Sequence, residues 1–231
     1  MKKIVLMLAI MLLATTCYAS ERDLNEVALR VREKLQITDA YDHLSVYSEG
    51  AGYTLYGYNE EGSIHIITDE NLILKSLYRY QEVSNVKRLP KLTKKDALET
   101  ALIFAVRNAA DIIGQLDTST PVISFVNGAY NVRFERKIDG VNYKSDGVNI
   151  VVDADKGTVT RYERNFTSNI PFVSAKKVID SSLARQKFIE NIGLELRYNK
   201  KITDKRVTPY LVYTPAGNKI LDAVTGQAVT V

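Results

Sequence analysis

Histidine and cysteine, which often carry catalysis or bind metal ions, are scarce in this chain. Its 231 residues include two histidines, one cysteine and no tryptophan. His43 and His65 form no His-x-x-x-His pair and have no third ligand nearby in the sequence, so we predict no metal site. His65 alternates with Ile64 and Ile66, and a strand at this position would direct the imidazole away from both isoleucines.

A carboxylate-rich phrase occurs in two versions. Residues 153–157 read Asp-Ala-Asp-Lys-Gly, and residues 222–226 read Asp-Ala-Val-Thr-Gly. Alternating carboxylates before a glycine resemble the start of a calcium loop, but a complete loop needs a third oxygen ligand and a later glutamate. Because the second copy lacks its second aspartate, the repeat favours a turn between two strands, with calcium binding as the weaker alternative.

Signatures of nucleophilic and acid–base catalysis are also missing from the sequence. There is no Gly-x-Ser-x-Gly elbow. No pair of carboxylates stands out as a glycosidase site, although the separation of such a pair exists only in three dimensions. We therefore predict no catalytic residues, no cofactor and no enzymatic activity, and keep an unrecognised hydrolase as a third hypothesis.

Tyrosines gather in the first third of the chain. Seven of the fourteen lie between residues 41 and 80. In a strand, Tyr56 and Tyr58 share one face while Tyr53 lies on the other. We predict Tyr53, Tyr56 and Tyr58 as candidate partner-binding residues, because an aromatic ring offers contact area with a polar tip. Cross-strand packing is the alternative role.

The N-terminus has the layout of a secretory signal peptide. Two lysines precede an apolar run, and Ala19 provides a small residue for cleavage, so we expect residues 1–19 to be removed. No transmembrane segment is then expected, and the protein is predicted to be secreted or located in the cell envelope. A lipid anchor on Cys17 is the less favoured alternative, since Thr16 fits the preceding position poorly.

Removal of that segment leaves 29 basic and 27 acidic residues, which lowers the formal net charge from +4 to +2. The basic clusters at 87–95 and 200–206 are interleaved with acidic and apolar residues. We therefore predict no nucleic-acid partner. Without Cys17 the chain holds no cysteine, so packing alone would stabilise it outside the cytoplasm.

Helical and strand patterns alternate along the rest of the chain. The first segment, 20–82, has a helix around 24–35 followed by four short strands near 44–47, 52–58, 63–68 and 74–80. A linker, 83–92, contains Pro90 and marks a boundary. The next segment, 93–168, opens with Thr93 and Asp96 as a capping pair before a helix that runs to about Ile113.

Strands of this middle segment are predicted at 122–126, 130–138, 148–152 and 158–166. The last segment, 172–231, repeats the theme with a helix over 174–192, ended by Gly193, and strands near 194–198, 208–213, 219–222 and 228–231. We therefore predict an α+β fold of three tandem units, each with one helix packed on its own short antiparallel sheet.

The order of elements in 92–166 resembles the PepSY-like YcdB/YcdC repeats of bacterial secreted and envelope proteins. The resemblance rests on the helix start at 92–97, the strand at 130–136, the segment 141–154 and the Gly-Thr-Val at 157–159. The Asp-Ala-x-x-Gly turn extends it to 221–229. The first segment matches in element order only, with Thr-Asp-Glu-Asn at 68–71 in place of that phrase.

The resemblance implies a fold without catalytic residues, used by propeptides that inhibit or chaperone secreted peptidases and by envelope sensor domains. It leads us to expect a non-enzymatic binding or regulatory protein that acts on a secreted peptidase in trans or on another envelope protein, by edge-strand or sheet-face recognition. A cell-wall or glycan binding module that uses the tyrosine-rich face is the alternative.

Overall fold

The computed structural model describes residues 23–37, 41, 43–81, 90–203 and 206–230. The chain divides into two compact units, one that ends at Asn169 and one that spans Ile170–Val231. Each unit is considered by itself. The predicted signal peptide 1–19, Cys17 and most of the predicted linker 83–92 lie outside the described residues.

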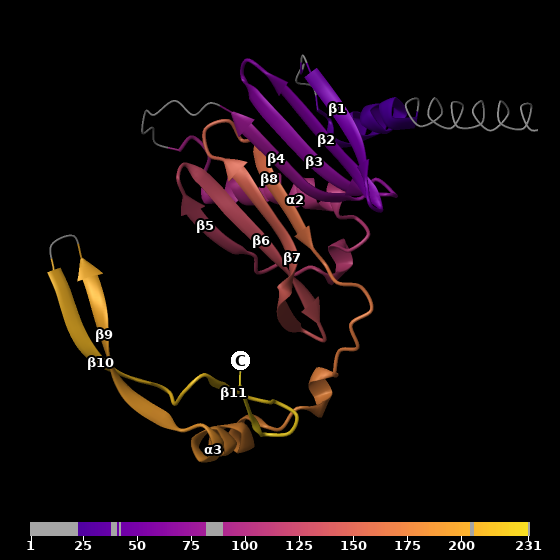
Figure 1. The fold of residues 1–231 in the computed structure, drawn as a ribbon. Coiled ribbons are helices and arrows are strands. Elements are labelled where there is room, and N and C mark those ends of the chain that lie inside the picture. The colour runs from indigo at the N-terminus through magenta and orange to yellow at the C-terminus, as the bar shows by residue number, and fades with distance from the viewer. Residues whose placement is uncertain (1–22, 38–40, 42, 82–89, 204–205, 231) are drawn as a thin grey trace, which may run out of the picture. The chain divides into compact units, whose positions relative to one another are not determined.

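The first unit contains a single sheet of eight antiparallel strands in the order β1-β2-β3-β4-β8-β7-β6-β5 (Figure 1). The strand bounds are β1 (His43–Glu49), β2 (Gly52–Asn59), β3 (Gly62–Asp69), β4 (Leu74–Gln81), β5 (Val122–Val126), β6 (Ala129–Ile138), β7 (Val141–Asp153) and β8 (Val159–Asn165). Strands appear at all the predicted places, but β7 begins seven residues before the predicted start at 148 because it pairs with β6 beyond a register shift after Glu135.

Two four-stranded meanders, β1–β4 and β5–β8, are joined into this sheet where β4 pairs with β8. The partners are Ser76 with Glu163, Leu77 with Tyr162, and Tyr78 with Arg161. The prediction of tandem units, each with its own short sheet, is therefore wrong. An unpaired edge strand exposes a row of N–H and C=O groups, and the β4–β8 pairing satisfies one such edge of each meander.

Helical residues 23–35 and α2 (Lys94–Asn108) pack on one face of this sheet. The predicted capping pair is confirmed at the start of α2: Thr93 Oγ1 accepts from the Asp96 N–H at 3.2 Å, and the Asp96 carboxylate accepts from the Thr93 N–H at 2.9 Å. These two bonds satisfy backbone donors that the first helical turn leaves unpaired. A short 3₁₀ turn, η1 (Ile113–Gln115), follows α2.

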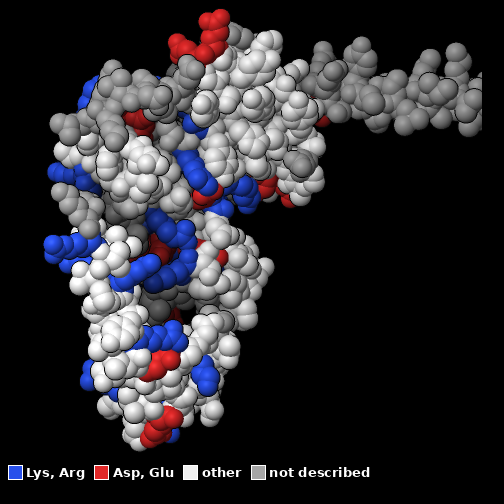
Figure 2. All heavy atoms as spheres, turned by 60° about the vertical axis from the view of Figure 1, so that its left-hand side comes forward, with Lys and Arg blue, Asp and Glu red and all other residues white. Residues whose placement is uncertain are grey.

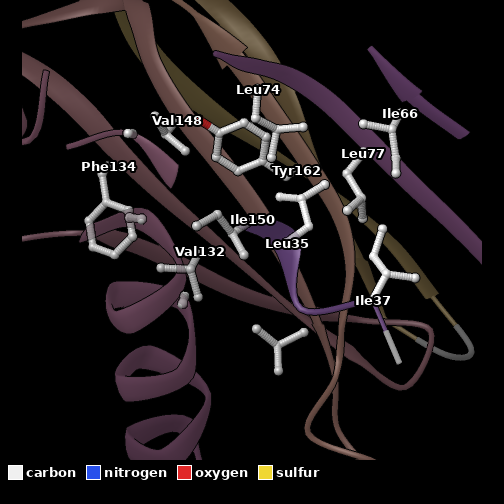
Figure 3. Close-up of a cluster of buried hydrophobic side chains, with 14 of the residues drawn as sticks. Leu35, Ile37, Ile66, Leu74, Leu77, Val132, Phe134, Val148, Ile150 and Tyr162 are labelled. Carbon is white, nitrogen blue, oxygen red and sulfur yellow. The ribbon is translucent and has the colours of Figure 1, made fainter. Parts of the chain in front are cut away.

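Both helices share one hydrophobic core with both meanders. Ala97, Ala101 and Ala105 of α2 are completely buried, and these small side chains let the helix lie close to the sheet. Figure 3 shows Leu35, from the end of the first helix, within the same cluster of buried side chains as Leu77 from β4 and residues of the second meander. The core therefore runs across the β4–β8 junction.

The second unit has few buried side chains. Its elements are η2 (Ala175–Lys177), α3 (Ser181–Asn191), β9 (Leu194–Thr203), β10 (Arg206–Pro215), β11 (Lys219–Leu221) and β12 (Ala228–Thr230). The strands form two separate two-stranded sheets, β9–β10 and β11–β12. Asp180 caps α3, so the helix begins seven residues after the predicted start at 174. Among the described residues of this unit, Ile192 is the only buried large apolar side chain.

The repeated Asp-Ala-x-x-Gly phrase forms the same turn in both places, as predicted. Asp153 Oδ1 accepts from the backbone N–H groups two and three residues further on, both at 2.8 Å. Asp222 Oδ1 makes the same two bonds, also at 2.8 Å. The fifth residues, Gly157 and Gly226, have φ values of +69° and +70°, which glycine adopts at low cost. The carboxylate at the start of each phrase therefore accepts hydrogen bonds from the backbone of its own turn.

Candidate functional site

The face of the eight-stranded sheet opposite the helices, here called the outer face, carries a row of aromatic and imidazole rings. Alternate residues of a strand point to opposite faces, so the strands that bury Leu55, Ile64 and Ile66 direct their intervening side chains outward. His65 points away from its buried isoleucine neighbours, as predicted. The ring row crosses β1 to β4 and consists of His43, Tyr58, Tyr56, His65 and Tyr78.

Each ring contacts the next along the row. The His43 and Tyr58 rings are stacked, with centroids 4.6 Å apart and planes inclined by 23°. Tyr58 and Tyr56 are 5.9 Å apart, Tyr56 and His65 are 6.5 Å apart, and His65 and Tyr78 are 6.3 Å apart. Strand register produces most of this order, because Tyr58 lies opposite His43, and His65 lies between Tyr56 and Tyr78. Such contacts restrict the motion of the rings.

The rings remain accessible despite these contacts. Tyr56 and Tyr58 keep 43% and 44% of their surface exposed. Tyr80, on the same face two residues beyond Tyr78, is also exposed. The structure therefore brings two of the predicted residues, Tyr56 and Tyr58, together on an open surface.

The third predicted residue, Tyr53, lies on the other side of the sheet. Its side chain packs against the hydrophobic core. It also lines a shallow groove together with Val27 of the first helix and Leu72 of the β3–β4 turn. Tyr53 is therefore separated from Tyr56 and Tyr58 by the thickness of the sheet.

A charged cluster ends the ring row at β8. The Tyr78 hydroxyl donates to Glu163 Oε1 at 2.6 Å, and Arg161 Nη2 donates to the same oxygen at 2.6 Å. The Arg161 guanidinium also lies 5.1 Å from the centre of the Tyr78 ring. The strand register explains the cluster, because Tyr78 is directly opposite Arg161.

Hydrogen bonding shifts the pKa values in this cluster in directions that favour the ordinary protonation states. The bond to Glu163, assisted by burial, raises the pKa of the Tyr78 hydroxyl. Burial acts to raise the pKa of Glu163, but the hydrogen bonds from Tyr78 and Arg161 together lower it below its ordinary value. Near neutral pH the row thus ends in a neutral tyrosine, an anionic carboxylate and a cationic guanidinium.

The sequence patterns did not identify His43, His65, Tyr78, Arg161 and Glu163 as members of this surface. For the residues of β1 to β4, alternation with buried neighbours was a usable signal. Arg161 and Glu163 had no comparable signal, because their place beside Tyr78 depends on the pairing of β4 with β8.

Other charged clusters of the first unit tie elements together. Arg136 Nη1 donates to Asp146 at 2.9 Å and to the Thr167 carbonyl at 2.8 Å, and the ion pair is buried. Arg164 donates two bonds to Asp111, at 2.7 and 2.5 Å, which lower the pKa of that carboxyl. These charged side chains hydrogen-bond to partners within the protein, as structural ion pairs do.

Within the described ranges, no cluster of three or more His, Cys, Asp or Glu side chains is arranged to hold a metal ion. The helices among the described residues are also too short or too polar to cross a membrane. In the view of Figure 2, the Lys and Arg side chains form several separate groups with Asp and Glu among them.

Comparison with known proteins places the chain in a family. No curated protein matches it. A crystal structure of an uncharacterized protein from Eubacterium rectale ATCC 33656 is similar over 90% of this chain and 81% of that one, with 11% identity and a TM-score of 0.45. The family described as the YcdB, YcdC repeated domain matches residues 28–165, which is more than half of the 231 residues. The chain therefore belongs to the YcdB/YcdC repeated-domain family, as the resemblance of its motifs predicted.

Proposed function

We propose that this protein is a non-enzymatic, extracytoplasmic binding protein that recognises another secreted or envelope protein, with a secreted peptidase as the partner to test first. The observation that carries the proposal is the ring row with its charged end on the outer face, where Tyr56, Tyr58 and Tyr78 are exposed. Location outside the cytoplasm rests on the signal-peptide layout of residues 1–19, and the peptidase on the function of related modules.

The composition of the outer face suits a protein partner. Tyrosine and arginine are enriched among the residues that dominate binding energy at protein interfaces. Tyr56, Tyr58 and Tyr78 supply such rings beside Arg161. With strands about 4.8 Å apart, a row from β1 to β8 spans about 20 Å, which fits within one interface of standard size.

Ring-to-ring contacts also lower the entropic cost of binding. A free tyrosine side chain loses rotamer freedom when a partner immobilises it, at a cost of about 0.5–1.5 kcal/mol. Tyr56 contacts both Tyr58 and His65 in the unbound protein, so part of that freedom is already lost on folding. The outer face is thus prepared to bind without rearrangement.

Glycan binding is the second candidate function, and one feature favours it. The near-parallel stack of His43 and Tyr58, inclined by 23°, forms a small platform of ring faces at the β1 edge of the row. A flat aromatic surface with polar tips can pack against the apolar face of a sugar. Retention on purified cell wall distinguishes this function from peptidase binding.

A double substitution tests the proposal. We expect Tyr56→Ala plus Tyr58→Ala to weaken inhibition or binding of the host's secreted peptidases by at least about tenfold, because truncating central aromatic residues typically costs more than about 1.4 kcal/mol. Peptidase activity in culture fluid, titrated with the purified protein, is the measurement. Cell-wall retention is assayed in parallel.

Tyr210→Ala is the matched control, because Tyr210 has the same exposed fraction as Tyr58, 44%, and lies in the second unit. It is expected to leave binding unchanged. If the double variant titrates peptidase and cell wall like the wild type, the outer face is not the binding surface.

A further inference from the structure

The β9–β10 hairpin of the second unit has one apolar face and one polar face. Ten residues of each strand pair without interruption, so residues directly opposite each other share a face. One face carries apolar side chains at every position except Lys200, and this set is called the hairpin face. Its members are Leu194, Leu196, Tyr198, Lys200, Ile202, Val207, Pro209, Leu211, Tyr213 and Pro215.

None of the described residues of the second unit covers the hairpin face. Its seven large non-proline apolar residues keep between 52% and 77% of their surface exposed. The helix α3 packs against β11 instead, and none of its residues is buried. In the first unit the helix before the corresponding strands, α2, buries its alanines on β6, β7 and β8.

An isolated two-stranded ribbon is only marginally stable in water and needs a further strand or a packed face. Within the described part of the chain, β9 and β10 pair only with each other. Long runs of exposed apolar side chains on soluble proteins mark interaction surfaces. The hairpin face therefore requires an occupant.

We propose that the occupant is the hairpin face of a second copy of this chain, so that the protein forms a symmetric dimer through its C-terminal unit. The seven apolar residues expose roughly 900 Å² if each presents on the order of 200 Å² when fully open, and a stable interface of standard size takes about 800 Å² from each partner. Lys200 is the one charged residue of the hairpin face. The centres of protein interfaces are likewise depleted in charged residues.

Proline and charge positions specify how the copies meet. Pro209 and Pro215 lack the N–H group that the addition of another strand to β10 would use, which favours face-to-face packing over edge pairing. Lys200, Lys201 and Arg206 make the hairpin tip basic, so an antiparallel arrangement that separates the two tips is favoured. A two-fold axis then passes near Tyr198 and Leu211, the middle pair of the face.

Sedimentation of the full chain tests the dimer. We expect the wild type to dimerise at micromolar concentrations and Leu211→Glu to raise the dimer dissociation constant at least about tenfold, because it buries an unpaired charge at the centre. Thr208→Glu is the control: Thr208 is exposed on the polar face, three residues from Leu211, and its substitution is expected to leave dimerisation unchanged. Circular dichroism checks that both variants stay folded.

Cysteine cross-linking tests the geometry in a Cys17→Ser background, which removes the single native thiol. Leu211→Cys is expected to form a disulfide-linked dimer under mild oxidation, whereas Thr208→Cys is not. A chain that stays monomeric at about 100 µM while the amides of 194–215 are protected from exchange would show another occupant and overturn the proposal. Equal behaviour of the Leu211 and Thr208 variants would overturn it too.

Discussion

Asp146 forms a buried ion pair with Arg136 in the first unit. Its side chain is almost fully buried and accepts a hydrogen bond from Arg136 at 2.9 Å and from the Thr167 N–H at 3.0 Å. Arg136 also lies 4.1 Å from the centre of the Phe166 ring. This cluster fastens the extension of β6 and β7 to the segment that follows β8. A buried charge of this kind is tolerated only while its partner is present.

We expect Asp146→Ala to lower the free energy of unfolding by about 3–5 kcal/mol, because it leaves the Arg136 guanidinium buried beside no carboxylate. Chemical denaturation followed by circular dichroism measures the change. Glu26→Ala serves as the control, since Glu26 belongs to an exposed pair with Arg30 and its loss is expected to cost less than about 0.5 kcal/mol. Similar costs for both variants would show that the buried pair is not a stabilising contact.

Among the predicted binding residues, strand alternation alone decided which could act together. Tyr56 and Tyr58 are two positions apart and share the outer face, whereas Tyr53 differs from them in parity and packs toward the core. That division was predictable from the sequence. The rings that complete the row, from His43 to Tyr78, depend on which strands are neighbours and on their register.

The helix α2 shows how a sequence pattern specifies packing at the scale of an element. Its buried alanines recur every four residues, at 97, 101 and 105, and form one smooth stripe. A helix with such a stripe can approach a sheet more closely than one with large side chains. Ile103, by contrast, lies on the exposed side of the same helix.

Ala101→Leu is expected to destabilise the first unit by about 1–3 kcal/mol, because the site is fully buried and three added carbon atoms have no space. Thermal unfolding measures the change. Ile103→Ala is the control, and it is expected to change stability by about 0.5 kcal/mol or less. A leucine tolerated at 101 without loss of stability would mean that α2 packs less closely than described.

At the scale of the first unit, the β4–β8 pairing makes two meanders into one cooperative structure. Leu77 of β4 is buried and lies directly opposite Tyr162 of β8, which is also buried. The helices of both halves contribute to the same core. Neither meander can therefore lose its packing without exposing apolar surface of the other.

Leu77→Ala is expected to cost about 2–5 kcal/mol and to reduce amide protection in β5–β8 as well as in β1–β4. Hydrogen exchange read by mass spectrometry resolves the two halves. Val122→Ala, at an exposed position of the edge strand β5, is the control and is expected to leave protection in β1–β4 unchanged. Loss of protection confined to β1–β4 would indicate two independent folding units.

The amino-acid sequence by itself determined the places of most helices and strands, the repeated turn at Asp153 and Asp222, the shared face of Tyr56 and Tyr58, and the family. Each of these follows from patterns that span a few residues. Tertiary structure alone decided that β4 and β8 join the meanders into one sheet, that Tyr78 meets Glu163, 85 residues away, and that the described residues of the second unit leave the hairpin face exposed. The physical reason is that strand alternation is a local property, whereas the choice of edge partner depends on the apolar surface that distant segments bury together.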